Sequence, residues 1–272
     1  MTYHRYLGVC LGGGKSDRTS LAVLDYYPEH KKLLLSTLFE TIEGDEKRSA
    51  DTVLIDLVKQ NEDNLRWIAM DVALGLPQCL TCRLKCPGVE ECHQPHIEWM
   101  WNHFRRRRRE NKNVRLFTPY TERCVEFFAQ TEMEEPFYLQ SALGANMAPL
   151  TARAHFLLRR LPKNRMIEVA PEVSFWRLAH VLEVPGLRRP RQSRDFEEDE
   201  LRHRFLAALL KDWPLFVYQQ DIQRMTDNFY ALDAFLAAIT AFLKDQGETE
   251  KRPRGFPKGE AWVEFPLKNF RF

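Results

Sequence analysis

The chain has 272 residues and a mass of 32.1 kDa, with 44% hydrophobic and 12% aromatic residues. This composition supports a substantial core and excludes wholesale disorder. Its 40 basic and 38 acidic side chains give a net charge of +2, which excludes a polycationic nucleic-acid carrier and leaves only local basic patches. No run approaches the ~20 apolar residues of a membrane span, and the first residues lack a secretory signal. We therefore expect a single cytoplasmic domain over residues 1–272 that does not engage a membrane.

Three short apolar runs predict three strands within the first forty residues, at 6–11, 20–26 and 32–39. Short polar linkers join them, which is typical of hairpins and favours an antiparallel meander. Helical spacing of apolar residues follows over 50–60, with Ser49 as the expected N-cap. The run at 66–71 then reads as a buried strand ending on Asp71, and a helix before it is the connection that a parallel pairing requires.

The pattern is irregular between residues 77 and 149, which we interpret as an insertion with helical segments and a zinc knuckle over 77–97. Regular alternation resumes beyond it. The elements expected there are helices near 151–161, 173–182, 197–210 and 227–244, a strand at 166–169, and a last strand at 262–265 that closes the sheet. The fold class is thus α/β, with three antiparallel strands, further parallel strands and flanking helices.

Four of the six cysteines lie within fourteen residues, with the spacing Cys79-x2-Cys82-x3-Cys86-x5-Cys92. In a reducing compartment such clustering favours a metal site over a disulfide framework. Four thiolates would make a closed, tetrahedral and structural zinc site, and the spacing of ferredoxin clusters is absent. The nearby His93 and His96 are expected at the surface or around the site rather than as ligands.

The glycine-rich segment that follows the first strand, Gly12-Gly13-Gly14-Lys15-Ser16, invites comparison with a phosphate-binding loop. That motif needs four residues between its first glycine and Gly-Lys-Ser, and here five residues separate Gly8 from Gly14. A phosphate-binding loop must also open a helix, whereas the next apolar run reads as a strand. We therefore expect a hairpin turn.

Three carboxylates stand in apolar settings. Asp71 ends a strand, Glu168 lies inside another, and Asp233 interrupts the apolar face of the last long helix. A buried carboxylate costs several kcal/mol unless it is paired or bound to a cation. Separate core salt bridges are one interpretation. The other is convergence on Mg²⁺ or Mn²⁺, which metal-dependent phosphodiester hydrolysis needs.

The densest positive segment is a run of five arginines: Arg105, Arg106, Arg107, Arg108 and Arg109. Arginine forks suit phosphates, and the neighbouring Trp99, Trp101 and Phe104 are of a type that stacks on bases. The alternative is that the arginines are solvated or paired with acids while the aromatic rings pack internally. We favour phosphate binding for this run. A second basic group lies at 188–194, ahead of an acidic group at 195–200.

Four phrases occur in order along the chain, at residues 68–77 (IAMDVALGLP), 117–123 (FTPYTER), 167–172 (IEVAPE) and 232–238 (LDAFLAA). Together with the predicted order of strands and helices, they resemble the predicted ribonuclease H-like nucleases known as domain of unknown function 429. The resemblance spans nearly the whole chain. It implies a ribonuclease H-like sheet, a nucleic-acid substrate, and a divalent-metal site in which Asp71, Glu168 and Asp233 take the places of the family's acids.

The resemblance also implies an aspartate at the end of the first strand, where this chain has Cys10. A thiol is a poor ligand for Mg²⁺, which points to impaired catalysis. Asp17 in the following hairpin, and the pair Arg123 and Glu126 in a family-like phrase, are possible supporting residues. The pair is equally well explained as an i, i+3 contact on a helix surface.

Three hypotheses for the function remain. The first is a metal-dependent nuclease, and the second is a non-catalytic module on the same fold that binds nucleic acid or protein, which Cys10 favours. The third is a phosphotransferase of the sugar kinase and actin superfamily, which ranks last because a second glycine-rich phosphate loop is missing. The sequence leaves the oligomeric state open.

Overall fold

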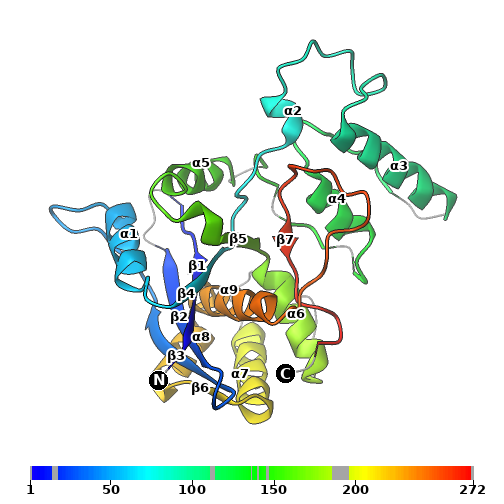
Figure 1. Ribbon diagram of the computed structural model, residues 1–272. Helices are drawn as coiled ribbons and strands as arrows, with labels where there is room; N and C mark the ends of the chain where they lie inside the picture. The colour runs from blue at the N-terminus through cyan, green and yellow to red at the C-terminus, as the bar shows by residue number, and fades with distance from the viewer. Residues whose placement is uncertain are drawn as a thin grey trace. The chain divides into compact units, whose positions relative to one another are not determined.

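The computed structural model of the protein describes residues 2–13, 18–110, 114–135, 137–139, 141–144, 147–185 and 196–270 (Figure 1). Within these residues, seven strands form one mixed sheet in the order β6-β3-β2-β1-β4-β5-β7. The strands are β1 (His4–Cys10), β2 (Ser20–Tyr27), β3 (Lys32–Phe39), β4 (Leu65–Met70), β5 (Met166–Val169), β6 (Leu215–Phe216) and β7 (Val263–Glu264).

The pairing of the strands confirms the predicted meander and crossover. β1 is antiparallel to β2, and β2 is antiparallel to β3. β4 then lies on the other side of β1 and runs parallel to it, and β5 runs parallel to β4. The carboxyl ends of β1, β4 and β5 therefore meet at one edge of the sheet, which is where parallel sheets commonly bind ligands.

The helices of the described residues flank this sheet or lie in the segment between β4 and β5. They are α1 (Ala50–Gln60), α2 (Gln78–Thr81), α3 (Pro95–Arg109), α4 (Cys124–Thr131), α5 (Met147–Leu157), α6 (Pro171–Val181), α7 (Phe196–Asp212), α8 (Gln219–Asp227) and α9 (Phe229–Asp245). None of them is both long and apolar enough to cross a membrane.

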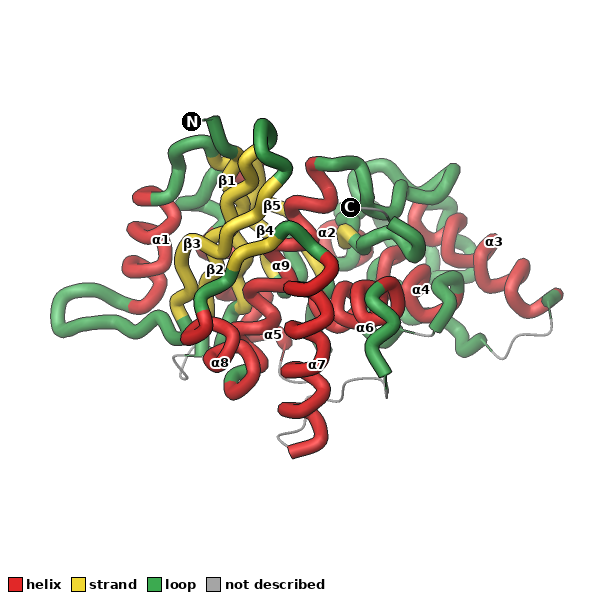
Figure 2. The backbone as a smooth tube through the Cα atoms, turned by 90° about the horizontal axis from the view of Figure 1, so that it is seen from below, coloured by secondary structure: helices red, strands yellow, loops and turns green. Residues whose placement is uncertain are grey.

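Helix α1 begins and ends where the sequence predicts. The Ser49 side chain accepts a hydrogen bond from the backbone N–H of Thr52, 3.3 Å away, so it caps the helix as expected. Leu54, Ile55 and Val58 form the buried stripe. Figures 1 and 2 show α1 on the opposite face of the sheet from α9.

Helix α9 is the central helix of the core and packs against β1, β2 and β4. Twelve of its seventeen residues are buried, because it is covered by the sheet on one side and by α6 and α8 on others. The closest approach is at Gly8 in β1, where a Cβ atom would lie 2.0 Å from the carbonyl oxygen of Ala234 and 2.4 Å from the backbone nitrogen of Ala238. Gly8 thus lets the α9 backbone lie directly on β1.

Replacing Gly8 with alanine is expected to destabilise the fold by about 2 kcal/mol or more, because backbone atoms cannot yield as a flexible side chain would. Thermal or denaturant unfolding measures this. Gly144→Ala is the control, since the nearest atom to its added Cβ is a side-chain carbon 3.2 Å away. Unchanged stability of Gly8→Ala would contradict the packing of α9 on β1.

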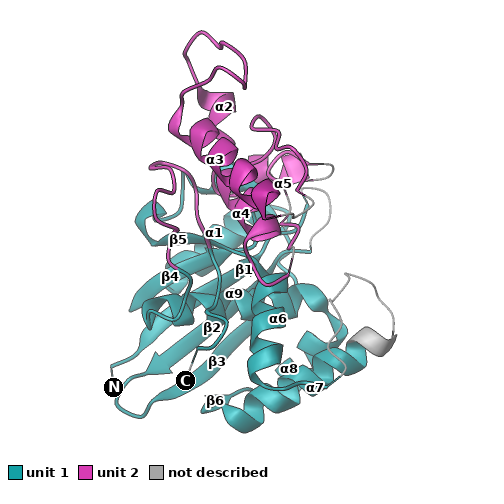
Figure 3. Cartoon of the chain, turned by 90° about the vertical axis from the view of Figure 1, so that its right-hand side faces the viewer, with its two compact units in different colours: residues 1–72, 153–250, 264–272 teal, residues 73–152, 251–263 magenta. Residues whose placement is uncertain are grey.

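The chain divides into two compact units, drawn teal and magenta in Figure 3. The first unit consists of residues 1–72, 153–250 and 264–272, and holds strands β1 to β6 and α9. The second unit consists of residues 73–152 and 251–263, and holds α2, α3 and α4. The segment 77–149, which the sequence predicts to be an insertion, falls within the second unit.

Candidate metal centre

Three donor side chains converge at the carboxyl-end edge of the sheet in the first unit. Cys10 is the last residue of β1, Asp71 follows the last residue of β4, and Asp233 lies in the second turn of α9. One ligand atom from each lies within 4.8 Å of the others, and this is the one such group of three among the described residues. Two carboxylates that the sequence singled out are therefore brought together.

Asp71 is held by the end of β1. Its Oδ1 accepts a hydrogen bond from the backbone N–H of Leu11 at 2.8 Å, and its Oδ2 accepts one from the Cys10 thiol at 2.9 Å. The Asp71 backbone N–H donates to the Val9 carbonyl at 3.3 Å, which continues the parallel pairing of β1 with β4. The carboxylate is thus oriented before any ligand binds.

Asp233 reaches this site because α9 lies so close to β1. The helix begins at Phe229 with Asn228 as its N-cap, whose side chain accepts from the Tyr230 N–H at 3.0 Å. The close approach of Gly8 in β1 to Ala234 in α9 sets how near to the sheet the helical turn with Asp233 lies. Asp233 remains partly exposed, whereas Cys10 is buried.

Burial raises the pKa of all three donor side chains, Cys10, Asp71 and Asp233. Burial raises the pKa of Asp71 to about 6, even though the hydrogen bonds from Cys10 and Leu11 oppose the shift. Burial, and then the charges of Asp71 and Glu172, raise the pKa of Asp233 well above its usual range. Burial, and then the charges of Asp71 and Asp233, also raise the pKa of the Cys10 thiol. Like charges in a desolvated site favour either protons or a bound cation.

Glu172 is a residue of this site that sequence reasoning missed. It lies in the first turn of α6, just beyond the end of β5, and acts electrostatically on Asp233. Glu168, which the sequence favoured, lies inside β5 opposite Met70 and outside the group of three donors. The sequence did carry a signal for Glu172, because an acid that follows a parallel strand reaches the same edge of the sheet as Asp71. Arg202 in α7 partly offsets the negative charge at Asp233.

The glycine-rich segment joins two antiparallel strands, β1 and β2, so the hairpin prediction is confirmed and no helix follows it. Arg153 fixes the base of this hairpin, donating from Nη1 to the Gly12 carbonyl at 2.5 Å and to Thr19 Oγ1 at 3.0 Å. Asp17, a possible supporting residue, lies outside the described residues, as do residues 188–194.

Arg123 and Glu126 form the predicted i, i+3 pair, with Nε donating to Oε1 at 2.7 Å. The pair lies in the second unit and is buried rather than on the surface: Arg123 is 1% exposed and Glu126 is 6% exposed. Glu260 lies near it, and burial raises the pKa of Glu260 to about 7 despite the Arg123 charge. The Arg123–Glu126 pair is thus part of a buried ionic cluster of the second unit.

The cysteine cluster also lies in the second unit, with Cys79 and Cys92 partly buried and Cys82 and Cys86 exposed. All four are free thiols. Burial raises the pKa of Cys79 to about 11, with further contributions from Cys92, Cys82 and Cys86 in that order. Among the described residues, no three of these sulfurs lie within 4.8 Å of one another, and no such group of three includes His96. The zinc knuckle remains a prediction.

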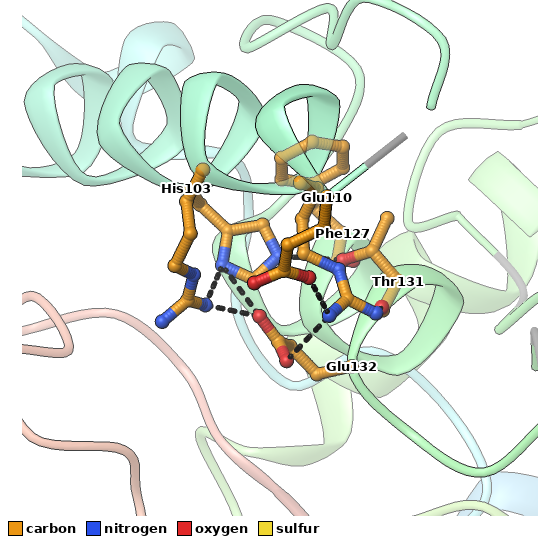
Figure 4. Close-up of polar contacts among 7 residues, drawn as sticks. His103, Glu110, Phe127, Thr131 and Glu132 are labelled. Atoms are coloured by element: carbon orange, nitrogen blue, oxygen red, sulfur yellow. Dashed lines mark hydrogen bonds and ion pairs between the residues drawn. The ribbon is translucent and has the colours of Figure 1, made fainter. Parts of the chain in front are cut away.

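Two of the five arginines proposed to bind phosphate are engaged within the second unit (Figure 4). Arg107 is buried and pairs with Glu110 at 2.8 Å and Glu132 at 3.4 Å, and Arg106 also pairs with Glu132. His103 contacts Arg106 at 3.1 Å, and burial together with both arginines lowers the pKa of His103 to about 3, so it is neutral. The side chains of Arg106 and Arg107 therefore stabilise the packing of α3 against α4.

The other three arginines of the run, Arg105, Arg108 and Arg109, are exposed. The guanidinium of Arg105 lies over the Trp101 ring, and that of Arg108 over the Phe104 ring, at 5.4 and 5.5 Å from the ring centroids. Stacking of this kind leaves the N–H groups at the edge of a guanidinium accessible to an anion. Phosphate binding stays a prediction for these three.

The donor set of Cys10, Asp71 and Asp233 fits a divalent cation, with two hard oxygen ligands and one soft sulfur. Carboxylates alone suit Mg²⁺, whereas a thiolate suits more thiophilic ions. Of the two ions that the sequence predicts, Mn²⁺ is thus the better match.

Comparisons of the chain with curated proteins and with solved structures give no match. A match to a protein family does exist over residues 45–257, a range that includes Asp71, Glu172, Asp233 and the cysteine cluster but begins after Cys10. The family is described as protein of unknown function (DUF429). Because the match covers well over half of the chain, the protein belongs to the DUF429 family.

Proposed function

We propose that the protein is a divalent-cation-dependent phosphodiester hydrolase of ribonuclease H-like fold that acts on nucleic acid. The observation that carries this proposal is the convergence of Cys10, Asp71 and Asp233 within 4.8 Å at the carboxyl ends of parallel strands. An antiparallel meander, a helix, a parallel strand ending in aspartate and a late helix bearing a second aspartate support the ribonuclease H-like assignment.

In this proposal Asp71 and Asp233 hold the cation, Mn²⁺ in preference to Mg²⁺, and Cys10 contributes the third donor. The cation supplies Lewis-acid stabilisation of the charge that develops on phosphate oxygens. The Leu11 N–H keeps Asp71 in one orientation, and the Arg202 charge limits the repulsion at Asp233. Glu172, exposed and close to Asp233, is a group able to accept a proton from an attacking water.

A nucleic-acid substrate has two sources of support. The resemblance noted in the sequence implies it, and Arg105, Arg108 and Arg109 present exposed guanidinium groups, two of them stacked on aromatic rings. Guanidinium groups recognise phosphates through paired N–H donors. The second candidate, a binding module without catalysis, is favoured by one observation, the presence of a thiol where an acid would bind Mg²⁺ best.

The test is incubation of the full chain with single-stranded, duplex and branched nucleic acids in the presence of Mn²⁺, Mg²⁺ or a chelator. We expect cleavage that depends on Mn²⁺ and is weaker at pH 5 than at pH 8, because protons compete with the cation for Asp71, whose pKa is raised to about 6. Salt-sensitive binding without cleavage would support the binding module instead. If the protein neither cleaves nor binds nucleic acid, both candidate functions are overturned.

A further inference from the structure

The second unit contains an imidazole–thiol pair that the predicted four-cysteine site does not include. The Nε2 atom of His96 lies 3.3 Å from the Sγ atom of Cys79. Two ligands of one tetrahedral zinc ion lie about 3.5 Å apart when the Zn–S and Zn–N bonds are about 2.3 and 2.0 Å long. The pair thus has the spacing of two neighbouring zinc ligands.

His96 is placed for this role by the fold. It is the second residue of α3 and only 3% exposed, whereas His93 lies on the surface with its side chain 88% exposed. The thiol of Cys124 donates to the His96 carbonyl at 3.6 Å. Within the described residues the Nδ1 atom of His96 has no hydrogen-bond partner, so the polar contact of the ring is through the nitrogen that faces Cys79.

The spacing along the chain selects the remaining ligands. Cys79-x2-Cys82 and Cys92-x3-His96 are two ligand pairs of the kind found in structural zinc sites with three cysteines and one histidine. His96, at the N-terminus of α3, contacts Cys79, and the partial positive charge of that helix end favours a thiolate there.

We propose that the second unit binds one structural zinc ion through Cys79, Cys82, Cys92 and His96, and that Cys86 is not a ligand. The ion ties the loop over residues 79–92 to the start of α3. None of these residues belongs to the group of Cys10, Asp71 and Asp233, so the proposal stands whether or not the protein cleaves nucleic acid.

The test measures zinc in the full-length protein purified without chelator, by elemental analysis. We expect one ion per chain, unchanged in Cys86→Ser and in the matched control His93→Asn. In Cys82→Ser, Cys92→Ser and His96→Ala, zinc affinity should fall by more than ~100-fold, because the loss of a ligand exceeds the 10–100-fold cost of losing an outer-shell partner.

A second measurement covers the case in which a variant fails to fold. Cobalt is bound to chains carrying Cys10→Ala, so that the Cys10 sulfur of the other candidate site makes no contribution to the sulfur-to-cobalt absorption. His96→Cys should retain the ion and show stronger sulfur-to-cobalt absorption, since a fourth thiolate replaces the imidazole. The proposal is overturned if the wild-type protein contains no zinc, if Cys86→Ser loses it, or if His96→Ala keeps it at full affinity.

Discussion

Replacing Asp71 or Asp233 with asparagine is expected to lower Mn²⁺-dependent cleavage by at least ~100-fold, because a bound cation contributes several kcal/mol of transition-state stabilisation. Asparagine keeps the size of the side chain and can still accept the Leu11 N–H bond at position 71. What it removes is the negative charge that holds the cation. The initial rate of cleavage at saturating Mn²⁺ measures the loss, and isothermal titration measures the weaker cation binding.

The matched control is Asp63→Asn, which removes an exposed carboxylate of the same unit. It should cleave at the wild-type rate. Stability without divalent cations separates a functional role from a structural one. Asp233→Asn should raise the melting temperature, because it removes the cost of burying a carboxylate and also the repulsion from Asp71 and Glu172. Cleavage that survives both substitutions would remove the site from these residues.

Much of the fold of the first unit could be predicted from the sequence, because its elements carry a clear apolar period. Helix α1 and strands β3 and β5 match their predicted bounds, and α9 lies within two residues of its predicted ends. Helix α8 was missed because Ile222 and Met225 are the only large apolar residues in its nine positions. Strand β6 has two residues, too few to show a period.

The second unit was harder to predict, because polar side chains form part of its buried surfaces. Half of the buried residues of α3 are His96, His103 and Arg107, so the buried face of this helix does not read as an apolar stripe. Their burial depends on partners from elsewhere in the chain, such as Glu132 for Arg107 and Thr131 for His103. Such pairings become visible only once the chain is folded.

The candidate metal centre was predictable in part for the same reason. Asp71 stood out because it ends an apolar strand, and Asp233 because it interrupts the apolar face of a helix. Glu172 interrupts no apolar pattern, since it is the exposed residue of an otherwise buried first turn of α6. Its place in the site follows from the parallel register of β4 and β5, which brings the residues after both strands to one edge.

Replacing Cys10 with aspartate is expected to raise Mg²⁺-supported cleavage by at least ~10-fold relative to Mn²⁺-supported cleavage, because a hard oxygen takes the place of a soft sulfur. Position 10 already lies within 4.8 Å of the donor atoms of Asp71 and Asp233, so the new carboxylate needs no rearrangement of β1. It also adds a third acid to a desolvated cluster, and the variant should therefore be less stable than the wild type unless a divalent cation is present.

Cys10→Ser is the control, since it removes the sulfur without adding charge and should not gain Mg²⁺-supported cleavage. The wild-type result decides what the substitution means. If the natural protein cleaves with Mn²⁺, Cys10 tunes the choice of cation, and Cys10→Asp shifts that choice. If the natural protein binds nucleic acid without cleaving it, Cys10→Asp should create cleavage that was absent. An identical ratio of Mg²⁺ to Mn²⁺ activity in Cys10→Asp and wild type would show that Cys10 is not a ligand, and the cation would then depend on Asp71, Glu172 and Asp233 alone.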